Sequence, residues 1–422
     1  MNINTKFICN IFAIVLVFTA ITFANDNLQS AQNSKKYTDE CIKCHSENDM
    51  MPEHFSENDI HLQNGLSCAG CHGGLSTSAD EEIAMSKKNG FVGVPTKKEI
   101  PNFCGKCHSD ISKMQVFQAR ISTDQVSQYY ISKHGMQLKI GNKDVATCID
   151  CHTSHSILPA SDTRSTVYAA NIPNTCNNCH GNSDLMNKYN LKSNQVEEYS
   201  KGVHGIALLE KHDNSAPACN DCHGNHGAAP PGVKSISHIC GSCHVNNMNF
   251  FNNSNMAEPF AGLEIKACEQ CHGNHLIAKP SDEMLNVKTS TTCTECHDKG
   301  EDGYIASEMF YEKLTQLSEL YDSTKAMSEK IAIIGMNNIE IEYELKNVKQ
   351  ALIQSRTLVH TFDTSKVVGR TNEGVLASLN ALKLADHEIE EHDNRRIGYG
   401  ISTLILILLA GALYLKIKGL NT

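Results

Sequence analysis

The sequence predicts a mostly α-helical fold with much irregular loop, followed by long C-terminal helices and one transmembrane helix. Between Cys41 and His297 the chain is rich in Asn, Gly, Ser and Pro, which favours turns and short helices over sheet. From about Ile305 to Arg396 apolar residues recur at helical spacing, and no cysteine occurs there. Residues 398–415 then carry no charge and are dense in Leu and Ile.

The hydrophobic and aromatic content is low for a chain of this size. Of 422 residues, 40% are hydrophobic and 6% aromatic, and there is no Trp. Something other than side chains is therefore expected to fill the interior. The formal charge of −10, with no basic stripe interleaved with aromatics, argues against a nucleic-acid partner.

The N-terminus has the layout of a secretory signal peptide. Lys6 precedes the apolar run Phe7 to Phe23, and cleavage is expected after Ala24. The alternative is an uncleaved anchor, but the apolar stretch is short for a membrane span. In either case the bulk of the chain leaves the cytoplasm.

Near the C-terminus, residues 397–415 are predicted to form one transmembrane helix, bracketed by two arginines before it and two lysines after it. The alternative is a buried core helix, but nothing else in the sequence is apolar enough to surround it. With an exported N-terminus, residues 416–422 form a cytoplasmic tail. The predicted location is the inner (cytoplasmic) membrane, crossed once, with the rest of the chain in the periplasm.

The spacing of the cysteines is the strongest indication of the chain's chemistry. One of the 19 cysteines, Cys9, lies in the predicted signal peptide, and the other 18 form nine Cys-x-x-Cys pairs, each followed at once by His. In chain order, motifs 1 to 9 are Cys41/Cys44/His45, Cys68/Cys71/His72, Cys104/Cys107/His108, Cys148/Cys151/His152, Cys176/Cys179/His180, Cys219/Cys222/His223, Cys240/Cys243/His244, Cys268/Cys271/His272 and Cys293/Cys296/His297. This is the attachment motif for c-type haem. Two thiols three residues apart reach the two vinyl groups of one porphyrin, and the next residue places an imidazole under the iron.

Two other uses of Cys-x-x-Cys are a disulfide framework and zinc ribbons. Neither requires His after the second Cys, so we predict nine covalently bound haem c groups that act as the core. The expected parts are a signal peptide (1–24), a nine-haem domain (25–300), a long-helix hairpin (301–396), the transmembrane helix (397–415) and the tail (416–422). Breaks in the hairpin are expected near Gly335 and between Asp363 and Gly374.

An internal repeat indicates an extended array. One copy contains Tyr130-Ile131-Ser132-Lys133-His134-Gly135, and the next contains Tyr199-Ser200-Lys201-Gly202-Val203-His204-Gly205. Each copy closes with a motif that carries a further His three residues on, His155 or His226. A shorter third copy ends at His275, and a divergent leading copy spans 41–72.

The histidines outside the motifs are candidates for the sixth iron ligand. His155, His226 and His275 follow a proximal His by three residues, cannot reach around their own porphyrin, and are expected to bind the next haem. His134 and His204 recur in register between motifs, and His61 precedes motif 2 by seven residues. The alternative for each is a surface histidine. Further candidates are His54, His238 and His360, the last within reach of the last haem, whereas solvated side chains are expected at His212, His387 and His392.

The third repeat copy has Met256 where the others have His. Three interpretations stay open: Met256 is an axial ligand that gives a haem of higher potential, or the iron is open and catalytic, or a distant His substitutes and Met256 packs.

At its nine motifs, over about residues 41–297, the chain resembles multihaem cytochromes c of the cytochrome c3-like and octahaem-cytochrome group. This resemblance implies haems in parallel and perpendicular pairs. The chain departs from membrane-bound quinol-dehydrogenase cytochromes, whose anchor is usually N-terminal. It also lacks the Lys that replaces a proximal His in pentahaem nitrite reductases.

The predicted function is electron transfer by haem-to-haem hopping, between the quinone pool or a membrane redox complex and a soluble or membrane redox partner protein. The alternative is an oxidoreductase that acts on a small nitrogen or sulfur compound at an open iron. A structural or metal-storage role is the third class. The sequence identifies no catalytic residue and leaves an oligomeric assembly open.

Overall fold

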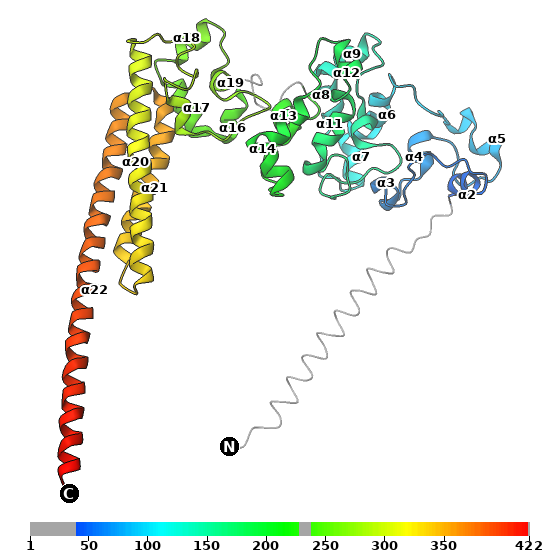
Figure 1. Ribbon diagram of the computed structural model, residues 1–422. Helices are drawn as coiled ribbons and strands as arrows, with labels where there is room; N and C mark the ends of the chain where they lie inside the picture. The colour runs from blue at the N-terminus through cyan, green and yellow to red at the C-terminus, as the bar shows by residue number, and fades with distance from the viewer. Residues whose placement is uncertain (1–38, 228–237, 421–422) are drawn as a thin grey trace. The chain divides into compact units, whose positions relative to one another are not determined.

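The computed structural model describes residues 39–227 and 238–420, and the predicted signal peptide lies outside this part (Figure 1). The described residues form helices and loops with no β-strand, which confirms the predicted fold class. The chain divides into two compact units, one of Met1–Cys176 with His226–Ala228 and one of Asn177–Asn225 with Ala229–Thr422.

In the first unit, the helices are short. They are α2 (Glu40–Glu47), α3 (Ile60–Gln63), α4 (Cys68–His72), α5 (Glu81–Ala84), α6 (Ile100–His108), α7 (Ile111–Val116), α8 (Gln125–Ile131), α9 (Lys133–Lys139) and α10 (Cys148–His152), followed by α11 (Ile172–His180), in which the unit ends. Two 3-10 turns lie at Lys87–Asn89 and Ala169–Asn171. Helices α2, α3, α4 and α10 contain no buried residue. The motifs on α2, α4 and α10 and the histidine on α3 are therefore held by helices that contribute no side-chain core.

The second unit continues in the same style and ends in three long helices. Its elements are α12 (Ser183–Asn187), α13 (Gln195–Lys201), α14 (Val203–Gly205), a π turn (Ile206–Glu210), α15 (Cys219–His223), α16 (Cys240–Cys243), α17 (Val245–Asn252), α18 (Ala257–Gly262), α19 (Ala267–His272), η5 (Asp282–Leu285), α20 (Asp302–Ile333), α21 (Ile339–Leu358), η6 (Val359–Thr361) and α22 (Thr364–Leu420). Motif 9 lies in turns rather than on a helix.

The internal repeat has a structural counterpart. Helices α8 and α9 meet at Ser132, and α13 and α14 meet at Gly202; both residues are extended, with φ −72° and −78°. The hydroxyl of Tyr129 donates to the Ala146 carbonyl, and that of Tyr199 donates to the Pro217 carbonyl, each at 2.8 Å. Each copy thus fixes a kinked helix pair against the residues just before the next motif.

Replacing Gly205 with alanine is expected to destabilise the second copy by about 1–3 kcal/mol, the usual cost of overpacking. The added Cβ would lie 2.0 Å from the Tyr199 carbonyl oxygen, a backbone atom that cannot move aside. Gly262→Ala is the matched control, because a Cβ at that position meets no atom within 4 Å. Denaturant unfolding of the two variants measures the difference, and equal stability would contradict the packing argument.

Helices α20, α21 and α22 pack side by side as a bundle (Figure 1). One cluster joins Leu314, Leu317, Val348, Ala351 and Leu352, and a second joins Ile331, Ile341, Ala381 and Ala385. Of the buried hydrophobic residues that the structure describes, eight lie before residue 302 and eleven lie in the bundle. The bundle therefore has a conventional core, and the longer stretch before it does not.

The chain reverses between α20 and α21 at Gly335, where φ is +75°. The second break is shorter than the sequence indicates, because α22 already begins at Thr364. Gly374 lies inside this helix, where a Cβ would come within 2.8 Å of Leu317 and Ala351 side-chain atoms. This glycine permits close helix packing and does not end a helix.

Helix α22 runs without interruption from the bundle through the apolar segment. Within the described chain, it alone is long and apolar enough to cross a membrane, and its apolar window is not covered by other residues. Leu404 and Leu408, for example, are 58% and 64% exposed. Apolar side chains this exposed over a full span fit a lipid surround.

Candidate haem-binding array

Six motif histidines each face one histidine from outside the motifs. The ring-centroid distances are 6.2 Å for His72–His155, 6.0 Å for His108–His61, 6.1 Å for His152–His226, 5.9 Å for His223–His275, 6.3 Å for His244–His204 and 6.1 Å for His272–His360. The ring planes are within 34° of parallel in five pairs and perpendicular in His108–His61.

This separation fits one iron between two imidazoles. A metal–imidazole bond is about 2 Å long and the ring centre lies about 1 Å behind the nitrogen, so two rings on opposite sides of one iron have centroids about 6 Å apart. Burial lowers the pKa of His152, and the nearby rings of His226 and His108 lower it further. The imidazole is thereby kept neutral, the form that binds a metal.

Several of these rings are oriented through Nδ1, which leaves Nε2 for a metal. His72 Nδ1 lies 2.8 Å from the Gly93 carbonyl oxygen, and His360 Nδ1 lies 3.0 Å from that of Thr357. His61 Nδ1 lies 3.1 Å from Asp59 Oδ1. Such partners fix both the tautomer and the ring plane of a ligand.

Asp59, which sequence reasoning missed, connects two parts of the array. It is 4% exposed, and it accepts hydrogen bonds from the backbone and ring of His61 and from the Ile157 N–H, at 2.7 Å. Burial raises the pKa of Asp59, but these hydrogen bonds outweigh burial and hold the pKa below its usual value. The contact with Ile157 joins residues that are 98 positions apart in the chain, so the sequence carried no signal for this role.

The six pairs follow a regular order along the chain. His61 lies between motifs 1 and 2 and faces motif 3, and His204 lies between motifs 5 and 6 and faces motif 7. These linker histidines face forward by two motifs. The histidines three residues beyond a motif face backward by two: His155 after motif 4 faces motif 2, His226 after motif 6 faces motif 4, and His275 after motif 8 faces motif 6.

The order corrects two expectations. The sequence predicts that His155, His226 and His275 reach the next haem, but each faces an earlier motif. His360 faces motif 8 and not the last motif. It occupies the place that a histidine after a tenth motif would take, with η6 packed against α17.

The other predicted ligands lie in short helices and turns. His54 has an 80% exposed side chain and an ion-pair contact with Glu53 at 3.5 Å. His238 is exposed, and Met256 is half-buried at the start of α18. His134 occupies in α9 the place that His204 has in α14. Their ligation stays a prediction.

Within the first unit, consecutive motifs are neighbours. Burial raises the pKa of the Cys71 thiol of motif 2 to about 11, with a further contribution from Cys104 and Cys107 of motif 3. The Cys104 thiol in turn hydrogen-bonds with Cys148 of motif 4. The attachment points of motifs 2, 3 and 4 therefore lie close together.

The second unit repeats this arrangement. The Cys240 thiol of motif 7 hydrogen-bonds with Cys268 of motif 8. Burial raises the pKa of Cys271 to about 11, followed by contributions from Cys293 and Cys296 of motif 9. The attachment points of motifs 7, 8 and 9 therefore lie close together.

The second cysteine of motif 1 contacts a neighbouring side-chain amide. The sequence predicts that the Cys44 thiol binds a haem vinyl group. In the structure Cys44 is exposed on α2, and its Sγ accepts a hydrogen bond from Asn48 Nδ2, 3.6 Å away. The same amide donates to the Cys44 carbonyl oxygen at 2.8 Å. Haem attachment at Cys44 therefore stays a prediction that depends on the motif.

The second cysteines of motifs 4 and 5 are described by local backbone contacts. Cys151 and Cys179 are both half-buried. The Cys151 carbonyl oxygen accepts a hydrogen bond from the Thr166 hydroxyl at 2.5 Å, and that of Cys179 accepts one from the Asn182 N–H at 3.0 Å. These contacts fix the backbone beside each motif and do not assign a role to the sulfur. The thioether bonds expected at Cys151 and Cys179 stay predictions as well.

Two buried amides also fit a bound porphyrin. Gln125 and Gln195 begin α8 and α13, the same place in the two copies, and in each the side-chain oxygen is buried without a hydrogen-bond partner. Buried polar atoms normally have a partner, and amide oxygen and nitrogen assignments can be interchanged. These side chains therefore suit a polar group such as a haem propionate.

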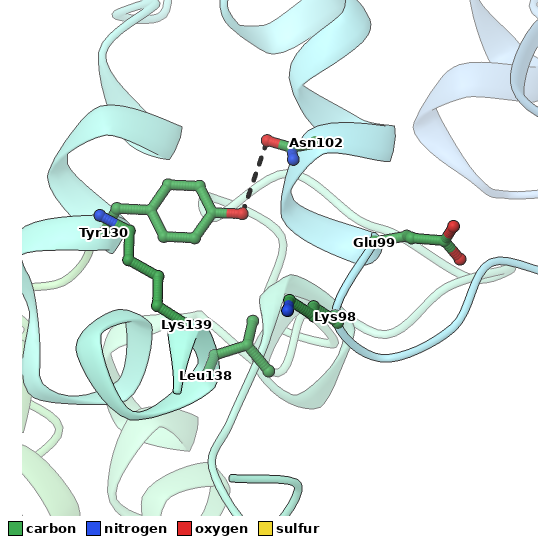
Figure 2. Close-up of a pocket in the computed structure, with 6 residues that line it drawn as sticks. All are labelled: Lys98, Glu99, Asn102, Tyr130, Leu138 and Lys139. Carbon is green, nitrogen blue, oxygen red and sulfur yellow. Dashed lines mark hydrogen bonds between the residues drawn. The ribbon is translucent and has the colours of Figure 1, made fainter. Parts of the chain in front are cut away.

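A small open cavity lies beside α6, α8 and α9 (Figure 2). It is lined by Lys98, Glu99, Asn102, Tyr130, Leu138 and Lys139. The Tyr130 hydroxyl lies 3.5 Å from Asn102 Oδ1, and the Lys139 ammonium lies 4.7 Å from the Tyr130 ring centre. The second copy has Ala170, Ser200 and Leu209 in place of Lys98, Tyr130 and Lys139, so this cavity is not part of the repeated frame.

Zinc ribbons would bring four ligands together. Among residues 39–227 and 238–420 no group of three or more His, Cys, Asp or Glu side chains is arranged to hold a metal ion. The side chains instead form histidine pairs beside two-cysteine motifs.

Three family models match parts of the chain. The model described as cytochrome c3 matches residues 60–181, that of the doubled CXXCH motif matches 259–302, and that of cytochrome c554 and c-prime matches 19–73. No curated protein and no solved structure matches the chain. With the motifs, these matches support a multihaem c-type cytochrome and imply covalently bound haem c.

Proposed function

We propose that this chain is a membrane-anchored electron-transfer protein of the periplasm that carries nine haem c groups. The single observation that carries the proposal is the set of six facing histidine pairs on motifs whose neighbours in sequence are neighbours in space. Bound haem supplies one-electron chemistry at each site. The chain sets the spacing, the axial ligands and the burial of the rings.

The proposed iron ligands are the nine motif histidines with His61, His155, His204, His226, His275 and His360 opposite six of them. His134 is proposed as a ligand because it matches His204 in the repeat. The surroundings of His54, which is 80% exposed beside Glu53, favour a solvated role, and His238 stays a candidate ligand. A signal peptide at 1–24 and the span at 397–415 would place the haem domain outside the cytoplasm, on the inner membrane.

The proposed partners are the quinone pool or a membrane redox complex on one side and a soluble or membrane redox protein on the other. Holoprotein in liposomes, supplied with a quinol or with membranes that contain a respiratory donor complex, tests this role. Appearance of the reduced haem band with either donor supports it. Reduction by dithionite alone, with no response to quinol or membranes, would overturn it.

A second function is favoured by one observation at motif 1. No histidine ring faces His45 in the described chain. In the forward order of the pairs, the facing histidine lies in a linker that follows the motif two before, and motif 1 has no motif before it. Residues 25–38 and 228–237 contain no His or Met. An open iron there would bind a small nitrogen or sulfur compound. A high-spin ferric signal and cyanide binding by one haem per chain support this, and low-spin spectra in every condition contradict it.

A further inference from the structure

The order of the histidine pairs extends to a residue that is not a histidine. Linker ligands lie between an odd-numbered motif and the next one, and they face the motif two further on: His61 faces motif 3 and His204 faces motif 7. The linker between motifs 7 and 8 contains no histidine, and it has Met256 at the aligned place. Two motifs further on is motif 9, with His297.

The local structure of Met256 resembles that of the linker histidines. His61 and His204 are each the second residue of a short helix, α3 and α14. Met256 is the N-cap residue just before α18, also a short helix, so it lies two positions earlier relative to its helix, and its side chain is half-buried. A thioether is the other common axial ligand of c-type haem iron besides imidazole.

His297 of motif 9 is oriented so that its iron could take a ligand of this kind. No histidine ring faces His297 within the described residues, whereas His360 is already engaged with His272 of motif 8. His297 Nδ1 lies 3.6 Å from the Glu301 carboxylate, and its ring packs on Gly303, where a Cβ would come within 2.5 Å. The ring is thus held through Nδ1 and one face, which leaves Nε2 for iron.

We propose that Met256 is the distal ligand of the haem on motif 9, which makes this haem a His/Met centre among bis-His neighbours. This inference rests on the haem ligation proposed above. Because a thioether stabilises ferrous iron relative to a second imidazole, the motif 9 haem has a higher reduction potential than motifs 7 and 8. It is therefore the electron sink of the second unit.

Optical spectra and redox titrations of the ferric holoprotein test the assignment. The wild type is expected to show the long-wavelength sulfur-to-iron charge-transfer band at an intensity of one haem per chain. Met256→Ala should abolish the band and let cyanide bind one further iron. Met256→His should abolish the band, keep the iron low-spin and lower the potential of one haem.

Met284→Ala is the matched control, since Met284 is also half-buried in the second unit, in η5 next to α20. It should retain the band. Absence of the band from the wild type, or its persistence in Met256→Ala, would overturn the assignment. Haem content and the low-spin signals of the other haems report separately on the proposed function, so a failure limited to the band leaves that function standing.

Discussion

Chain produced without haem attachment is expected to lose the fold of residues 39–301 and to keep the α20–α22 bundle. Among the residues that the structure describes, the stretch before residue 302 buries eight hydrophobic residues, against eleven in the much shorter bundle. A domain with so little apolar burial does not balance the entropy cost of ordering its backbone unless a covalent group replaces the core. Limited proteolysis followed by mass spectrometry should find a resistant fragment that begins near residue 302.

Holoprotein digested under the same conditions is the control, and it should resist cleavage on both sides of residue 302. Far-UV circular dichroism of the haem-free chain should retain the helical signal of the bundle. A cooperative unfolding transition of residues 39–301 without haem would contradict the role of haem as the core. The same experiment on the holoprotein counts the haems through the added mass, and peptide mapping shows whether Cys44, Cys151 and Cys179 carry thioether bonds.

Removal of residues 397–420 is expected to move the protein from the membrane fraction to the soluble fraction with its haems intact. The apolar part of α22 is uncovered in the structure, so its removal exposes no buried surface. Loss of about 20 apolar residues removes the span that a bilayer requires. Fractionation with haem staining measures the result.

Leu406→Ile is the matched control for this deletion, because it preserves the apolar surface of a residue that is 66% exposed. The control variant should stay with the membrane. If the deleted protein also sediments with the membrane, residues 1–24 act as an uncleaved anchor and α22 is not the sole attachment.

The parts of the fold that depend on local pattern were predictable. Helical spacing after residue 305 and the uncharged run after residue 397 indicated the long helices and the span. The second break was misplaced because Gly374 looks like a helix terminator in sequence, whereas it allows α22 to approach Leu317 and Ala351. Only the packing partner distinguishes these two uses of glycine.

The candidate site divides in the same way. Each proximal histidine is adjacent to its cysteines, so the motif alone identifies it. The facing histidines come from other segments, and spacing cannot tell whether His155 reaches forward or backward. The roles of Asp59, Gln125 and Gln195 depend on burial. Polar residues are common in loops and at helix starts, so the sequence does not indicate which of them are buried.

The length of the continuous helix α22 sets the distance between motif 8 and the membrane. His360, just before this helix begins at Thr364, faces His272 of motif 8, and the uncharged segment begins at Gly398. At 1.5 Å per residue, the helix lifts this end of the array about 50 Å above the lipid. A quinol in the bilayer is too far away to pass an electron to motif 8 in one step. A quinol would therefore reduce the protein at another haem, and electrons that enter at motif 8 would come from a membrane complex whose own redox centre stands alongside the bundle.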